Sequence, residues 1–111
     1  MPVRPTFKGQ PFGLSPDYVQ VIAGIVYAVP SVEKAVIFGS RVKGNFHKGS
    51  DVDIALYGDL DYSTVSHIQY QLNEETKIPL FFDVVAYSLL ENDALKEHID
   101  RVGQLVPGQN S

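Results

Sequence analysis

Three aspartates are the residues of this chain whose types and spacing could do chemistry. Asp51 and Asp53 lie two positions apart in the alternating run Asp51-Val-Asp-Ile-Ala-Leu-Tyr. On a strand both carboxylates would point to one face, roughly 6–7 Å apart. Asp83 interrupts the apolar run Phe81-Phe-Asp-Val-Val, where an unpaired buried charge would be costly.

Carboxylates gathered in this way predict a metal site. Like charges placed side by side repel each other, and a cation between them relieves the repulsion. A hard cation such as Mg²⁺ prefers carboxylate and phosphate oxygens. If the strand that carries Asp83 lies beside the strand that carries Asp51 and Asp53, the three carboxylates could hold two Mg²⁺ ions about 3.5–4 Å apart. That arrangement serves in-line displacement at phosphorus.

A turn that could bind phosphate precedes these acids. Gly39 and Ser40 follow a predicted strand, and glycine lets the backbone approach a phosphate closely. Backbone N–H groups at the start of a following helical turn would point at the phosphate. Arg41, Lys43 and Lys48 add positive charge to the same loop. One strand end therefore offers a phosphate cradle, and its neighbour offers metal ligands.

The helices and strands that must position these residues are predicted from apolar periodicity and from residues that begin or end helices. Ser15-Pro16-Asp17 begins a helix with a capping hydroxyl, and Pro30 stops it. A second helix begins after Asp61 or Ser63 with the apolar stripe Tyr62, Val65, Ile68 and Leu72, and a third begins at Asn92-Asp93.

The strands come from apolar and alternating runs. We predict them over residues 32–38, 51–57 and 80–87, and a short edge strand at 105–106. Gly103 is expected as the left-handed residue that ends the third helix. The fold class is α/β (α+β), a small mixed sheet with the helices packed on one face. Residues 1–14 are expected to be an irregular arm, 15–106 the domain and 107–111 a tail.

Composition narrows the class of protein. The 111 residues suit one domain, and the absence of cysteine excludes disulfides and thiolate metal sites. No apolar run reaches the roughly 20 residues of a membrane span, and the first residues carry no signal-peptide core. We therefore expect a cytoplasmic protein without a membrane partner. The formal net charge of −4 disfavours direct nucleic-acid binding.

The stretch from Gly39 to Ile54 resembles the signature of the polymerase-β-type nucleotidyltransferases, a Gly-Ser turn, a variable loop and then Asp-x-Asp. Its fuller form, Gly-Ser-Arg-x-x-Gly followed by Ser-Asp-x-Asp, is similar to the minimal nucleotidyltransferases. These small bacterial and archaeal proteins are often encoded beside a helical HEPN partner. The resemblance covers roughly residues 15–106 and implies the nucleotidyltransferase fold.

The resemblance also implies roles for individual residues. Asp51 and Asp53 would bind metal and triphosphate, and Asp83 would bind the catalytic metal and activate the attacking hydroxyl. The Gly39-Ser40 turn would hold the β and γ phosphates. The nucleotide-binding set is completed by Arg41, Lys43 and Ser50, of which Ser50 braces the loop rather than reacts.

The same resemblance implies a substrate and a partner. In HEPN pairs the nucleotidyltransferase is an antitoxin that adds AMP from ATP to a tyrosine of the HEPN ribonuclease. The implied assembly is a hetero-oligomer of the two chains. Three other functions stay open: a binding module that neutralises its partner by contact alone, a nucleotidyltransferase for a small molecule or an RNA end, and a plain α/β domain. The acceptor, the base preference and the oligomeric state are not determined by the sequence.

Overall fold

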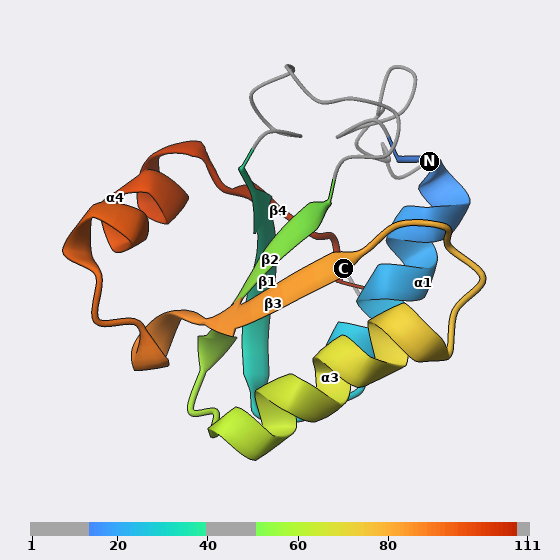
Figure 1. The fold of residues 1–111 in the computed structure, drawn as a ribbon, viewed down its shortest axis with the longest axis horizontal. Coiled ribbons are helices and arrows are strands. Elements are labelled where there is room, and N and C mark those ends of the chain that lie inside the picture. The colour runs from blue at the N-terminus through green and yellow to red at the C-terminus, as the bar shows by residue number, and fades with distance from the viewer. Residues whose placement is uncertain (1–13, 40–50, 109–111) are drawn as a thin grey trace, which may run out of the picture.

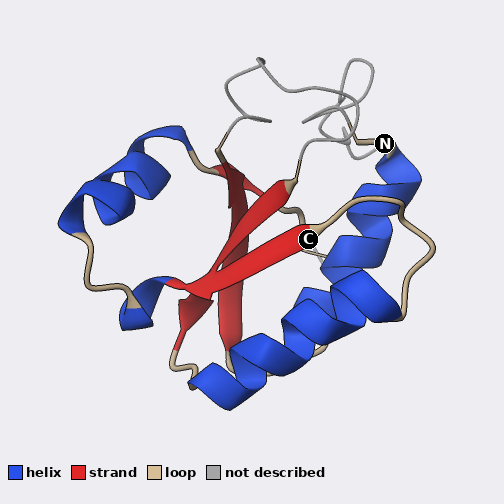
Figure 2. Cartoon of the chain, in the orientation of Figure 1, coloured by secondary structure: helices blue, strands red, loops and turns tan. Residues whose placement is uncertain are grey.

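A computed structural model describes residues 14–39 and 51–108, which form a four-stranded sheet with helices on either side (Figures 1 and 2). The elements in chain order are α1 (Pro16–Val26), β1 (Val32–Phe38), β2 (Val52–Gly58), α3 (Tyr62–Glu74), β3 (Phe82–Ala86), the 3-10 helix η2 (Tyr87–Leu89), α4 (Asp93–Val102) and β4 (Gln104–Leu105). The predicted helices and strands are therefore confirmed, with small shifts at their ends.

The strands lie in the order β3-β2-β1-β4. The sheet is mixed, as predicted. β1 pairs antiparallel with β2 on one side and with β4 on the other. β2 pairs with β3 in parallel, and α3 makes the crossover that a parallel pair requires. The parallel pair joins the two strands that carry the aspartates.

Helices cover both faces of the sheet, so the prediction that all helices pack on one face is wrong for α4. The helices α1 and α3 pack over the main core, whereas Ile99 of α4 packs against Val36, Phe38 and Ala55 on the opposite face (Figure 1). The reason is visible in β1, whose run Ala35-Val-Ile-Phe is apolar at every position and so needs cover on both faces.

The α-helices α1, α3 and α4 each begin at a side-chain cap. The oxygens of Ser15, Asp61 and Asn92 accept hydrogen bonds of 2.8–3.2 Å from the backbone N–H three residues later. Such a bond satisfies one of the donors that a helix start leaves without a partner. Of the two candidates for the second helix, the cap is therefore Asp61 and not Ser63.

Three details differ from the sequence-based expectation. The helix α1 ends at Val26, before Pro30. Tyr62 is 70% exposed, and the buried stripe of α3 begins at Val65. Gly103 has φ −60°, so it is not a left-handed cap. A side chain there would place its Cβ 2.6 Å from the Ile99 carbonyl oxygen, so close packing is what requires glycine.

The ends of the described chain are tied to the core. Leu14, the last residue of the predicted arm, is buried, and so is Val106 after β4. Tyr27 links the two regions, because its hydroxyl donates to the Val106 carbonyl at 2.6 Å and accepts from the Ala35 N–H. Within the part of the chain that the structure describes, no helix has the length and apolarity to cross a lipid bilayer.

Candidate active site

The three aspartates meet at one end of the sheet. In the parallel register Asp53 of β2 stands directly beside Asp83 of β3. Neighbouring strands lie about 4.8 Å apart, so the two side chains leave the sheet side by side. Asp51 precedes β2 by one residue, and its charge acts on the Asp53 carboxyl. The two acid-bearing strands therefore lie side by side, which is the condition that the sequence set for a three-carboxylate site.

Alternation directs these carboxylates away from the main core. Val52, Ile54 and Leu56 of β2 are fully buried beneath α1 and α3, which leaves Asp53 on the face that α4 covers. Across the antiparallel pair, Asp53 stands opposite Phe38. The His98 ring of α4 meets Phe38 edge-on, with centroids 6.2 Å apart. The acid end of the sheet therefore borders the small core beneath α4.

The electrostatics single out Asp53 among the three. Burial raises the pKa of the Asp53 carboxyl, and the charges of Asp83 and then Asp51 raise it further. Asp53 is half-buried, whereas Asp51 and Asp83 are exposed. Asp53 is therefore a carboxylate held against two like charges, and a cation placed among them would lower the free energy of its ionised form.

Gly39 closes the site on the β1 side. Its φ is +85°, in the left-handed region that favours glycine. An added Cβ would also overlap Oδ2 of Asp53. The absence of a side chain at Gly39 thus lets the turn after β1 approach the Asp53 carboxylate.

The backbone on both sides of Asp83 is held by α3, a feature that sequence reasoning missed. The Asn73 amide donates to the Phe82 carbonyl at 3.0 Å and accepts from the Phe82 N–H at 2.8 Å. Gln69 accepts from the Val84 N–H at 2.8 Å. The spacing of Gln69 and Asn73, four residues apart on one helix face, was the available signal. These side chains replace the missing neighbour strand at the edge of the sheet.

A groove of about 830 Å³ runs along this same edge. It lies between α3 and residues 78–84, and Asp51 forms part of its wall. The acid end of the sheet therefore opens sideways onto a concave surface.

The geometry agrees with a comparison against protein families. Residues 20–111 match the family described as polymerase beta, nucleotidyltransferase. This chain belongs to that nucleotidyltransferase family. The match includes the three aspartates and the Gly39-Ser40 turn, and the nucleotidyltransferase fold predicted from the motif is confirmed.

A curated relative of this chain comes from Methanocaldococcus jannaschii and is named "Putative protein adenylyltransferase". The two are 31% identical over 64 residues, which is 58% of either chain. The chain therefore matches a little over half the length of that relative.

Two solved toxin–antitoxin complexes contain chains with the same fold. One holds AMP-PNP, and its chain matches with a TM-score of 0.67 at 20% identity, over 86% of the present chain and 75% of that chain. The other is a tri-AMPylated HEPN toxin of Shewanella oneidensis bound to its MNT antitoxin, with a TM-score of 0.64 at 18% identity over 84% and 71%. At this identity the likeness establishes the fold alone.

Four predicted nucleotide-binding residues of this chain lie outside the described residues, namely Ser40, Arg41, Lys43 and Ser50. Their roles stay predictions. Among residues 14–39 and 51–108, no group of three or more His, Cys, Asp or Glu side chains is arranged so that it could hold a metal ion. The donor chemistry nevertheless fits Mg²⁺, which keeps several waters and takes one or two carboxylates together with substrate phosphates.

Proposed function

We propose that this chain transfers AMP from ATP to a hydroxyl group of a partner protein, with Mg²⁺ as cofactor. The observation that carries the proposal is the pairing of Asp53 with Asp83 beside the left-handed Gly39. These features would give one end of the sheet a turn that can approach a phosphate, a half-buried carboxylate for the metal and an exposed carboxylate for the acceptor hydroxyl.

Asp51, Asp53 and Asp83 would hold the metal, with two ions proposed, as three carboxylates allow. The raised pKa of Asp53, caused by burial and by the neighbouring acids, supports a cation at this position. When bound, Mg²⁺ would neutralise the triphosphate and the charge that develops at phosphorus.

The protein residues would perform the proton transfer and the positioning. Asp83 is exposed on the edge strand, where it takes the proton from the acceptor hydroxyl. The acceptor oxygen then forms a bond to the α phosphorus, the bond from that phosphorus to the bridging oxygen breaks, and pyrophosphate leaves. Gly39, with Ser40, Arg41, Lys43 and Ser50 of the following loop, would hold the departing phosphates.

The proposed acceptor is a tyrosine of a HEPN-family protein, and the chain acts as its antitoxin. Support comes from the adenylyltransferase name of the Methanocaldococcus relative and from the fold shared with a complex whose HEPN toxin carries AMP. We propose the cytoplasm as the compartment, because ATP is supplied there.

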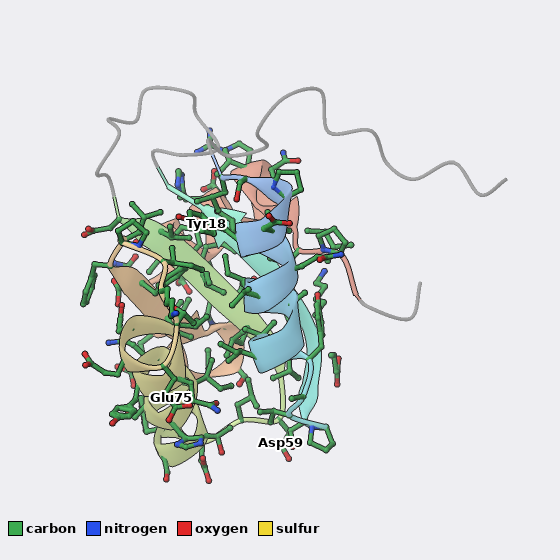
Figure 3. All side chains as sticks on the ribbon, turned by 90° about the vertical axis from the view of Figure 1, so that its right-hand side faces the viewer. Tyr18, Asp59 and Glu75 are labelled. Carbon is green, nitrogen blue, oxygen red and sulfur yellow. The ribbon has the colours of Figure 1, made fainter. Side chains whose placement is uncertain are left out.

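The test is an intact-mass measurement on a HEPN-family protein, the proposed acceptor. Both proteins are incubated with ATP and Mg²⁺, and wild type is compared with Asp51→Asn/Asp53→Asn. We expect the partner to gain one or more AMP masses with wild type and none with the double variant. Asp59→Asn is the matched control, because Asp59 follows β2 at the end opposite to Asp51 and Asp53. Figure 3 shows Asp59 at the opposite end of the molecule from Tyr18 and the start of α1.

The variant should remain folded, since its substitutions remove carboxylates that repel each other. No mass gain with wild type, together with suppression of toxicity by the double variant, would replace the proposal with an antitoxin that acts by contact alone.

A further inference from the structure

The groove between α3 and the edge strand β3 has features that the transfer chemistry does not explain. We propose that it is the docking groove for the polypeptide segment that carries the acceptor hydroxyl, and that this segment is cationic. The inference rests on the proposed transfer reaction and adds where the acceptor binds and what chemistry recognises it.

The first support is the order of groups along the sheet. Gly39 after β1, Asp53 in β2 and Asp83 in β3 follow one another across the sheet. The groove runs between α3 and residues 78–84 on the β3 side, and Asp51 of the acid end lies in its wall. In-line displacement requires the attacking oxygen and the departing pyrophosphate on opposite sides of the phosphorus. If the phosphates lie at the Gly39 side, the acceptor must arrive from the β3 side, where the groove opens.

The second support is the exposure of aromatic side chains around the groove. Among the described residues, five large apolar or aromatic side chains are exposed, and three of them line this groove. Tyr62 is 70% exposed, Tyr70 53% and Phe81 51%. Clustered aromatic side chains of this kind dominate the energetics of protein interfaces.

The third support is charge. The charged side chains among the described residues that line the groove are Asp51 and Glu74, and both are acidic. Phosphate-rich nucleic acid would meet repulsion there. A lysine or arginine of a polypeptide would find carboxylates and the faces of Tyr62 and Tyr70, which attract cations.

The edge strand itself limits how a polypeptide could bind. The outward backbone groups of Phe82 and the Val84 N–H already bond to Asn73 and Gln69. A segment cannot add to these groups as another strand, which is one common mode of peptide recognition. The proposed segment is therefore held by side-chain contacts. Substitutions of the aromatic and acidic side chains of the groove should weaken its binding directly.

The test measures the rate of AMP transfer to the HEPN-family chain against its concentration. The groove variants are Tyr70→Lys and Glu74→Lys, and the matched controls are Leu105→Lys at the opposite edge of the sheet and Glu33→Lys in β1, which are also exposed. We expect each groove variant to raise KM for the acceptor at least about tenfold, with KM for ATP and kcat changed less than about twofold. The controls should match wild type.

A second measurement does not depend on transfer. A photo-crosslinking p-benzoylphenylalanine at position 70 should form an adduct with the HEPN-family chain, and the same group at position 105 should not. Adducts without AMP transfer would support the groove and contradict the proposed reaction. Transfer with unchanged kinetics in both groove variants would overturn the groove. Competition by an oligoadenylate RNA that is strong in wild type and no stronger in Glu74→Lys would overturn the polypeptide occupant.

Discussion

The two faces of the sheet differ in the size of their apolar cores and in the charged residues that they carry. Beneath α1 and α3 lies a continuous apolar core, whose largest fully buried side chains include Phe82, Ile22, Ile68 and Leu72. The face beneath α4 has four buried residues, Val36, Phe38, Ala55 and Ile99. On that second face the sheet also carries Asp53 and Asp83.

The difference shows how a small domain can carry repelling carboxylates. The large core supplies most of the apolar burial that stabilises the fold, at about 25 cal/mol per Å². The face beneath α4 can then contain charges whose mutual repulsion raises the pKa of Asp53, without exposing the main core to water. Groups arranged for chemistry often reduce stability in this way.

A polar cluster helps to hold α4 where the apolar core is small. The hydroxyls of Tyr57 and Tyr87 donate to the two oxygens of Asp100 at 3.2 and 2.7 Å. The two rings stack with centroids 4.6 Å apart, and the Lys34 ammonium lies 4.4 Å from the Tyr57 ring centre. Tyrosines of β2 and η2 thus attach α4 to the sheet.

The largest effect should come from equal truncations on the two faces. Ile68 and Ile99 are both buried helix residues, one in α3 and one in α4. We expect Ile68→Ala to lower the free energy of unfolding by about 3–5 kcal/mol and Ile99→Ala by about 2–3 kcal/mol, because the smaller core can collapse around its cavity. Urea denaturation measures both values. Equal losses would show that the two cores are energetically equivalent.

A smaller and more local effect is expected from the two left-handed glycines of the β1–β2 pair. Gly39→Ala would push the Asp53 carboxylate aside, and such misplacement can reduce the rate by about 100-fold. At Gly58, with φ +137°, an added Cβ would instead overlap the Ser31 carbonyl oxygen. We expect Gly58→Ala to lower the melting temperature while the rate per folded molecule stays unchanged. A fully active Gly39→Ala would contradict the role given to this turn.

The smallest effect concerns the polar cluster. Burial first, and then Asp100, raise the pKa of Tyr57 to about 12. The stability contributed by this neutral phenol is present below pH 10 and is lost as the pH rises from 10 to about 12. Because the ring is partly solvated, the contribution is at most about 1 kcal/mol. In the Asp100→Asn variant, titration by ultraviolet absorbance should give a Tyr57 pKa that is lower than in wild type but still above 10. An unchanged pKa would show that Asp100 is not one of its causes.

The sequence by itself determined the local features. Alternation in residues 51–57 is enough to place Asp51 and Asp53 on one face, because side chains of a strand point to opposite sides in turn. Ser15 and Asn92 predict helix starts, because their side-chain oxygens accept hydrogen bonds from N–H groups of the first helical turn. The Gly39-Ser40 turn and the Asp51-x-Asp53 pair, with Asp83 on a later strand, were sufficient to indicate the family.

Tertiary structure alone decided how these local features meet. Register pairs Asp53 with Asp83, and no local signal specifies register between strands separated by a helix. The place of α4 followed from an apolar β1 that needs cover on both faces, and the bonds of Gln69 and Asn73 followed from β3 lying at an edge. Each of these contacts joins residues distant in the chain, so it depends on the packing of the whole domain rather than on any single segment.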